Sequence, residues 1–278
     1  MFELFEQIIE ENKKANPEKA GDYHVNGLLY CGKCHYPRQQ ETELMGHKFL
    51  PYIPCLCMQE EEQKEKEREE EVKRMIEIQR NTGICFYDQN MREWTFANDN
   101  HQGDASIMNA FLRYAENFPE MQKRKKGLLI YGSQGVGKSY GAGCVANHLL
   151  LKGYRCIMTS FSRIINAVSG MREGKQEYID DLCRYDLLII DDLSAERETE
   201  YAEEIVMNVI ETRCVSGLPI IITTNLTPEQ LKHTENERKK RIYSRLFGMT
   251  FPINYVGEDR RKRTIVNDYA EIKAILGL

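Results

Sequence analysis

The chain has 278 residues, enough for one large domain or for one domain with a small additional module. Hydrophobic residues make up 41% of it, charged residues make up 29%, and the formal net charge is −5, which together exclude a fibrous protein and wholesale disorder. No apolar run approaches the roughly 18 residues of a membrane-spanning helix. The first residues, Met-Phe-Glu-Leu-Phe-Glu, lack the basic stretch of a secretory signal, so we expect a cytoplasmic protein without a membrane partner.

Two helices are predicted in the N-terminal third of the chain. Four apolar residues at helical spacing predict a short amphipathic helix over residues 1–15: Leu4, Phe5, Ile8 and Ile9. Residues 60–71 contain eight acidic and three basic residues, with Glu and Lys or Arg repeatedly four positions apart. This spacing favours a solvated helix that runs to about Arg80.

A parallel sheet is predicted for the remainder of the chain. From about residue 105, four short apolar runs rich in β-branched residues alternate with helical patterns: Leu128–Tyr131, Cys156–Met158, Leu187–Ile190 and Pro219–Ile222. One helix between them has a buried stripe formed by Ala202, Ile205, Val206, Val209 and Ile210. Continuous apolar strands separated by helices are typical of an α/β fold in which helices cover both faces of a parallel sheet.

These patterns divide the chain into three parts. We expect a small N-terminal module over residues 1–58, a charged helical linker over residues 59–94 and an α/β domain over residues 95–278. A helix of this last domain is predicted to begin at Thr227, where Pro228 and Gln230 complete a capping pattern.

The strongest motif is a phosphate-binding loop. Gly132-Ser133-Gln134-Gly135-Val136-Gly137-Lys138-Ser139 fits the pattern G-x-x-x-x-G-K-[ST] after a predicted strand and before a predicted helix. Backbone N–H groups of such a loop bind phosphates, Lys138 reaches the β- and γ-phosphates, and the hydroxyl of Ser139 coordinates Mg²⁺. We expect these eight residues, with Tyr140, to bind ATP.

Polar residues follow two other predicted strands. Asp191 and Asp192 end the run Leu187–Ile190, and a buried carboxylate is costly unless it serves a cation. We expect Asp191 to hold Mg²⁺ and Asp192 to orient and help deprotonate the attacking water. Asn225 follows the run Pro219–Ile222 and either positions that water or caps the turn before the next helix.

As a set, these motifs resemble those of the DnaC/DnaI-type replicative helicase loaders of bacteria and phages. The resemblance covers about residues 95–263 and is carried by the phosphate loop, Leu187–Glu200, Thr223–Leu226 and Arg241–Leu246. Transposition helper ATPases of the IstB type share most of these motifs. The resemblance implies a P-loop AAA+ domain and an ATPase whose slow hydrolysis is stimulated by assembly or DNA.

The resemblance also assigns roles to single residues. It implies that Asn225 is the sensor 1 residue and that Arg245 is an arginine finger directed at the γ-phosphate of a neighbouring subunit. In the sensor 2 segment, Asp259 stands where the family usually has serine, so Arg260 and Arg261 are both candidates, and we prefer Arg261. The pair Asp191-Asp192 replaces the Asp-Glu of general AAA+ enzymes, which argues against fast hydrolysis.

Four of the nine cysteines predict a zinc site. Cys31-x2-Cys34 and Cys55-x-Cys57 can supply four thiolates in tetrahedral geometry, although the second pair is unusually tight, so His35 or His47 could replace one ligand. Such a closed site would be structural and would let a small module fold. By resemblance to DnaI-like loaders, this module is expected to dock on the replicative DNA helicase, a DnaB-type hexamer.

The segment between Lys232 and Arg263 is locally basic, with ten basic and four acidic residues, and Lys123–Lys126 adds a second basic cluster. Basic patches bind phosphate backbones without reading sequence, so single-stranded DNA is an expected partner, although a solvated or ATP-directed set of arginines fits equally. Trp94–Phe96 is a weak candidate for the adenine pocket, beside a plain core aromatic pair.

The sequence therefore predicts an ATP-dependent helicase loader that uses ATP, Mg²⁺ and Zn²⁺ and assembles through its AAA+ domains. Two alternatives remain. A transposition helper ATPase shares the ATPase motifs, but helpers of that type generally lack a zinc module. An adaptor in which Asp192 supports almost no hydrolysis would bind ATP as a structural ligand.

Overall fold

The computed structural model describes residues 16–44, 46–99, 105–193 and 199–260, and the single positions 11, 14, 269, 272, 273, 275 and 276. The chain divides into two compact units, Met1–Met75 and Ile76–Leu278, each of which is described by itself. The helix predicted over residues 1–15 lies almost entirely outside the described residues. Within the described part of the chain, no helix is both long enough and apolar enough to span a membrane.

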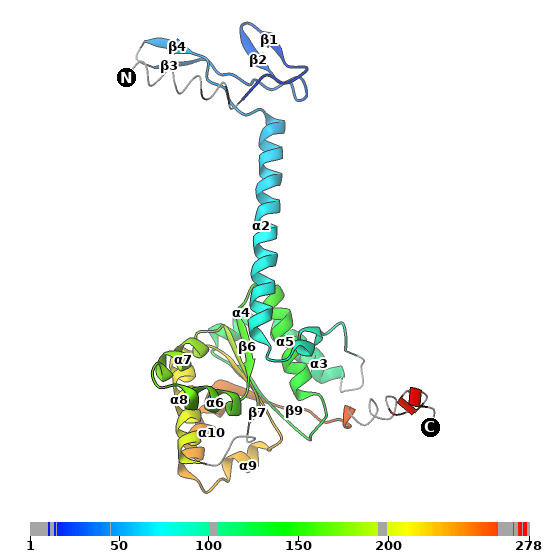
Figure 1. The fold of residues 1–278 in the computed structure, drawn as a ribbon, viewed down its shortest axis with the longest axis vertical. Helices are drawn as coiled ribbons and strands as arrows, with labels where there is room; N and C mark the ends of the chain where they lie inside the picture. Colours follow the sequence, from blue (N-terminus) through cyan, green and yellow to red (C-terminus); the bar gives the residue numbers. More distant parts are fainter. Residues whose placement is uncertain are drawn as a thin grey trace. The chain divides into compact units, whose positions relative to one another are not determined.

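The first unit contains two small antiparallel hairpins (Figure 1). One pairs β1 (Tyr23–Val25) with β2 (Leu28–Tyr30), and the other pairs β3 (Thr42–Leu44) with β4 (His47–Phe49). Among the described residues of this unit, few side chains are fully buried, and one of them is Arg38, which forms an ion pair with Asp22. With so little apolar surface removed from water, the unit needs a further source of stability.

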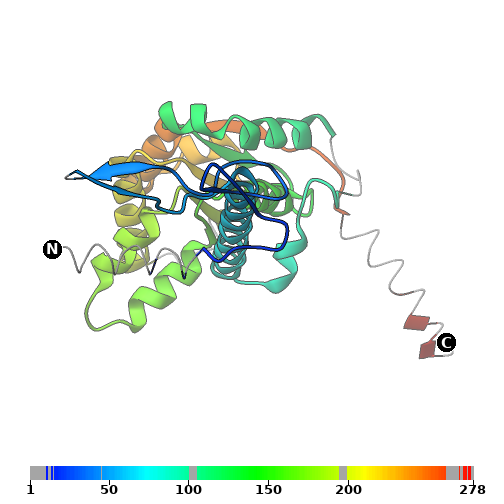
Figure 2. The same ribbon diagram turned by 90° about the horizontal axis from the view of Figure 1, so that it is seen from above.

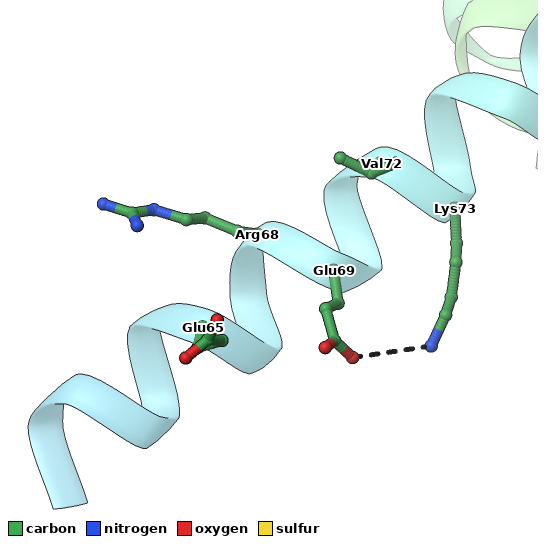
Figure 3. Close-up of a pocket in the computed structure, with 5 residues that line it drawn as sticks. All are labelled: Glu65, Arg68, Glu69, Val72 and Lys73. Atoms are coloured by element: carbon green, nitrogen blue, oxygen red, sulfur yellow. Dashed lines mark ion pairs between the residues drawn. The ribbon is translucent and has the colours of Figure 1, made fainter. Parts of the chain in front are cut away.

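Helix α2 (Leu56–Cys85) is the predicted charged helix. Figure 3 shows side chains that project outward from one stretch of it, with Glu69 and Lys73 forming an ion pair of 3.9 Å. The helix continues past the predicted end at Arg80, and its last residue, Cys85, is buried with Phe86 in the core of the second unit. This apolar burial explains the extra turn, because charge pairing alone does not specify where a solvated helix ends.

The second unit is built on a five-stranded parallel sheet with the order β6-β7-β8-β5-β9. Its strands in chain order are β5 (Gly127–Tyr131), β6 (Cys156–Thr159), β7 (Leu187–Leu193), β8 (Ile220–Thr224) and β9 (Thr250–Asn254). The four predicted strands are confirmed. The fifth, β9, was missed because it is an edge strand that contains Pro252 and exposes Phe251, so it has no continuous apolar run.

Helices cover both faces of this sheet (Figures 1 and 2). In chain order they are η1 (Gln89–Glu93), α3 (Ala105–Glu116), α4 (Phe118–Lys123), α5 (Lys138–Leu151), α6 (Phe161–Gly170), α7 (Lys175–Cys183), α8 (Glu200–Ser216), α9 (Pro228–Lys232) and α10 (Glu237–Met249). Alternate residues of β7 belong to different cores: Leu187 and Ile189 pack with α3 and α5, whereas Leu188 and Ile190 pack with α6, α7, α8 and α10. The predicted stripe of α8 and the capping box at Thr227 are both present.

The segment Trp94–Phe96 belongs to the core around α5. A Cβ atom at Gly143 would lie 2.5 Å from Cε3 of Trp94, so only glycine lets the indole ring pack this closely on the helix. Phe96 packs edge-on against His148 of the same helix. These contacts favour the plain core reading of the aromatic residues over an adenine pocket.

Candidate functional site

The predicted nucleotide-binding residues meet at one edge of the sheet. Strands β7, β8 and β5 are neighbours and run parallel, so their carboxyl ends present the acidic pair, Asn225 and the phosphate loop (Gly132–Ser139) side by side. Ligands of open α/β sheets bind at this edge. The loop passes directly into α5, which begins at Lys138, so the N-terminal end of a 14-residue helix faces the same place.

The lysine of the phosphate loop is held by the loop itself and by β8. Lys138 Nζ donates to the backbone oxygens of Gly132 (2.9 Å) and Ser133 (2.7 Å) and to Oδ1 of Asn225 (2.8 Å). Gly137 has a φ of +107°, a left-handed conformation that glycine adopts without strain. The structure thus brings the predicted site residues Lys138 and Asn225 together.

The acidic pair is organised by a threonine from the neighbouring strand. Thr223 Oγ1 donates to Oδ1 of Asp191 at 2.6 Å and accepts the backbone N–H of Asp192 at 2.9 Å. Asn225 Nδ2 in turn donates to Oδ1 of Asp192 at 3.4 Å. The ladder between β7 and β8 shifts register between Ile190 and Leu193, and Asp192 has a φ of +59°. This local irregularity turns Asp192 out of the strand pattern.

In the turn that follows Asn225, it is Thr224 Oγ1 that accepts a backbone N–H, from Leu226 at 3.1 Å. The side chain of Thr227 accepts the backbone N–H of Gln230 at 3.2 Å and closes the capping box of α9. The amide of Asn225 is instead shared between Lys138 and Asp192. The sequence analysis gave Thr223 no specific role, although this residue contacts both members of the acidic pair. Its position directly after a buried run of isoleucines, at the end of β8, could have indicated that it lies at the site.

Tyr87 lies close enough to the acidic pair to interact with it electrostatically. Burial, followed by the negative charge of Asp191, raises the pKa of Tyr87. The guanidinium carbon of Arg163 lies 3.9 Å from the centre of the Tyr87 ring. Nothing in the sequence pattern identified these two residues, because they come from segments far from every motif.

The predicted arginines have different surroundings. Arg245 of α10 lies against α8, where it forms an ion pair with Glu211, and its side chain is 40% exposed. Arg261 lies outside the described residues. Its neighbour Arg260 borders the phosphate loop, since its backbone N–H donates to the oxygen of Gly135 at 3.0 Å and its guanidinium pairs with Asp99 at 3.1 Å.

The four predicted cysteine ligands form one cluster in the first unit. The Sγ atoms of Cys31, Cys34, Cys55 and Cys57 all lie within 4.8 Å of one another, and among the described residues no other group of this kind is found. Backbone N–H groups of Cys34 and Lys33 lower the pKa of Cys31. Burial raises the pKa of Cys34, but hydrogen bonds from the backbone N–H groups of Cys57 and Tyr36 lower it. The lowering effects outweigh burial, and the pKa falls to about 6.

This donor set fits a tetrahedral thiolate-binding metal such as zinc. Hydrogen bonds with Cys55 and Cys31 raise the pKa of Cys57 to about 12, so this thiol ionises far less readily than that of Cys34. A bound cation would compensate the negative charge and favour the thiolate form of all four cysteines. His35 is engaged elsewhere, with Nδ1 at 3.0 Å from the hydroxyl of Tyr23. The side chain of His47 lies outside the described residues.

Comparison with known proteins identifies the family. Residues 37–264 match the family described as "IstB-like ATP binding protein". Replicative helicase loader DnaI of Bacillus subtilis (strain 168) is 27% identical over 148 residues, which cover 49% of this chain and 48% of that protein. Replicative helicase loader DnaC of Escherichia coli (strain K12) is 27% identical over 137 residues, which cover 47% of this chain and 55% of that protein. The chain spans about half the length of these curated relatives.

A solved structure extends the likeness to the fold. The crystal structure of DnaI superimposes with a TM-score of 0.53 and 22% sequence identity, over 62% of this chain and 96% of that chain. The family match covers most of the chain and includes the phosphate loop, the acidic pair and the cysteine-bearing segment from residue 37 onward. The chain therefore belongs to the IstB-like ATP-binding protein family, and its second unit is an AAA+ domain of the IstB/DnaC type.

Proposed function

We propose that the AAA+ domain binds and hydrolyses ATP at the edge formed by β7, β8 and β5. Lys138 is placed to exchange its contacts with loop carbonyls for nucleotide phosphates, and Ser139 and Asp191 are the residues that would hold Mg²⁺. The ion would neutralise charge on the β- and γ-phosphates. Thr223 fixes the carboxylate of Asp191, and Asp192 with Asn225 orients the attacking water.

We further propose that this ATPase loads the replicative DNA helicase onto single-stranded DNA, so that ATP binding and hydrolysis are coupled to helicase delivery and release. The observation that carries this proposal is the likeness to two proteins named as replicative helicase loaders. The cysteine cluster supports it, since a zinc-stabilised module joined to the ATPase by a charged helix is a suitable docking element for a second protein.

Two further surfaces belong to this proposal. Arg245 is placed on the exterior of α10, which suits an arginine that completes the site of a neighbouring subunit and makes hydrolysis depend on assembly. The same helix carries the exposed basic residues Arg238, Lys240 and Arg241, which would contact the backbone of single-stranded DNA. Arg261, the preferred sensor 2 candidate of the sequence analysis, stays a prediction, and the contact of Arg260 with Gly135 of the phosphate loop supports Arg260 as the alternative.

Native mass spectrometry with the replicative helicase from the same source tests the loader proposal. The full chain should form a stable complex with several copies per helicase hexamer in Mg²⁺ and ATP. Cys31→Ser with Cys34→Ser should abolish the complex while leaving ATP binding intact, which would place the docking surface in the first unit. Failure of the unmodified chain to bind the helicase with ATP or ADP would contradict the proposal.

The match to the IstB-like family keeps the second candidate of the sequence analysis, a helper ATPase of transposition. The same measurement with a transposase from the same source distinguishes the two, because a helper should bind transposase and not helicase. ATP turnover decides the adaptor alternative. Hydrolysis that is no faster in the unmodified chain than in Lys138→Ala, even with DNA and partner present, would show that ATP is a structural ligand.

A further inference from the structure

A buried ion pair joins the segment that precedes α3 to the segment that follows β9. Arg260 Nη1 lies 3.1 Å from Oδ1 of Asp99, and the two side chains are only 14% and 5% exposed. Arg260 also donates from Nη2 to the hydroxyl of Tyr255 at 2.8 Å, and its guanidinium lies 5.6 Å from the ring centre of Tyr140. Charges removed from water to this extent need well-placed partners, and Asp99 is the counter-charge of this arginine.

This ion pair borders the phosphate loop. The backbone N–H of Arg260 donates to the oxygen of Gly135, and a Cβ atom at Gly137 would stand 3.0 Å from Nε of Arg260. The carboxylate of Asp259 packs against Gly135, where a Cβ atom would stand 1.9 Å from its Oδ1. The loop therefore has a guanidinium and a carboxylate as immediate neighbours, and a second carboxylate, that of Asp99, holds the guanidinium.

Guanidinium groups bind carboxylates and phosphates with the same planar set of donors. A polyphosphate at the loop offers Arg260 a second anionic partner beside Asp99. Resting on the proposed binding of ATP at this loop, we propose that Asp99 is a positioning residue that competes with nucleotide phosphate for Arg260. The Asp99–Arg260 pair then sets nucleotide affinity, and bound ATP loosens the connection between the segments before α3 and after β9.

The chain provides its own reporter for a test. Its single tryptophan, Trp94, lies with its ring centre 5.8 Å from that of Tyr140, which in turn borders Arg260. Titration of the full chain with ATP and Mg²⁺, followed by tryptophan fluorescence and by equilibrium dialysis, gives the affinity of each variant. Asp99→Asn, which keeps the side-chain shape, should tighten ATP binding by about tenfold, within the usual range of coupling between two sites. Arg260→Met should weaken binding, and adding Asp99→Asn to it should change nothing further.

Two other variants distinguish competition for Arg260 from a general effect of removing a negative charge. Asp181→Asn removes the carboxylate of an exposed pair with Arg184, an Asp–Arg contact of 2.7 Å on the surface of α7, and should leave ATP affinity unchanged. Asp259→Asn removes negative charge beside the loop without releasing Arg260 from Asp99. Its effect on affinity should therefore persist in the Arg260→Met background, where that of Asp99→Asn is lost.

The outcomes test separately whether ATP binds at the loop and whether Asp99 competes with it for Arg260. If the unmodified chain binds no ATP by either readout, nucleotide binding at the loop is itself wrong. If it binds ATP, and a folded Asp99→Asn binds it equally or more weakly, the competition is wrong. Hydrogen exchange of the unmodified chain gives an answer that needs no variant: saturating ATP should speed exchange at residues 96–99 while slowing it at residues 132–139, and slower exchange in both segments would overturn the proposal.

Discussion

Lys138 and Asn225 are hydrogen-bonded, with Nζ of the lysine 2.8 Å from Oδ1 of the asparagine. This contact joins the loop after β5 to the end of β8, so the residue that we propose binds phosphate also contacts the residue that we propose orients the attacking water. Because Asn225 also contacts Asp192, one amide links the residues of the two proposed functions, nucleotide binding and hydrolysis. The two functions should therefore respond differently to changes at these positions.

Replacing Lys138 should remove nucleotide binding, and replacing Asn225 should remove hydrolysis alone. We expect Lys138→Ala to abolish saturable ATP binding, and Asn225→Ala to lower kcat about a hundredfold with little change in the dissociation constant, as for the loss of one group that acts in the transition state. Dialysis and phosphate release measure the two effects. Lys123→Ala, on the exposed end of α4, is the control, and equal losses of binding in both site variants would contradict the separation.

Thr223→Val tests the orientation of the acidic pair. Valine keeps the shape but leaves Oδ1 of Asp191 and the N–H of Asp192 without their shared partner. We expect kcat to fall about tenfold at unchanged KM, and stability to fall by about 1–3 kcal/mol, the cost of a buried polar group left unsatisfied. Thr223→Ser, which retains the hydroxyl, should restore most of kcat. Full activity in the valine variant would show that the hydroxyl does not position Asp191.

Asp192, which we propose orients the attacking water, also has an unusual backbone conformation. Its φ of +59° is tolerated by aspartate and asparagine far better than by alanine. Asp192→Asn should therefore keep the fold and ATP binding but lose hydrolysis, whereas Asp192→Ala should additionally lose about 1 kcal/mol of stability. Urea unfolding and single-turnover hydrolysis measure these effects. Rapid hydrolysis by the asparagine variant would assign the attacking water to another base.

Metal removal should unfold the first unit and spare the second. The cysteine cluster lies in a unit with few fully buried side chains, so bound zinc would supply much of its folding free energy. A strong chelator, or Cys31→Ser, should release about one zinc ion per chain and abolish the protection of β1 and β2 in hydrogen exchange, while protection of β5 to β9 persists. Cys214→Ser, at an exposed cysteine outside the cluster, is the control. Metal analysis that finds no zinc in the purified chain would contradict the assignment.

Arg213 should be critical for stability and irrelevant to chemistry. Its side chain is fully buried and donates to the backbone oxygens of Cys183 (2.8 Å), Tyr185 (2.7 Å), Asp186 (3.2 Å) and Pro219. Arg213→Met leaves these oxygens without their donor and should cost about 2–4 kcal/mol, judged from the penalty for unsatisfied buried groups. Urea unfolding followed by the tryptophan signal measures this loss, and Arg184→Met on the exposed surface of α7 should be neutral.

The sequence was sufficient to predict those features that depend on residues close together in the chain. The phosphate loop is contiguous, and the runs of β5, β7 and β8 are continuously apolar because these strands are buried on both faces, so the sequence alone predicted that they are strands of a parallel sheet. The four cysteines were predicted as one cluster because two closely spaced pairs of cysteines can together surround a tetrahedral metal ion. The structure brings their sulfur atoms together.

Long-range contacts between unlike segments could not be predicted in this way. Asp99, Tyr255 and Arg260 meet only after the sheet has formed, and no spacing rule links position 99 to position 260. Strand β9 was missed for a related reason, because a partly exposed edge strand with a proline has neither period nor continuous apolarity. The left-handed backbone at Asp192 is likewise set by the register shift against β8 and not by the residue type.

The order of the strands has a consequence for synthesis on the ribosome. Strand β5, which carries the phosphate loop, lies between β8 and β9, and the backbone N–H of Tyr255 donates to the oxygen of Tyr131 at 2.7 Å. The loop is therefore translated long before either neighbour of its strand, and one edge of β5 stays unpaired until β9 leaves the exit tunnel. A nascent chain that has produced the whole phosphate loop but not β9 should therefore still fail to bind ATP.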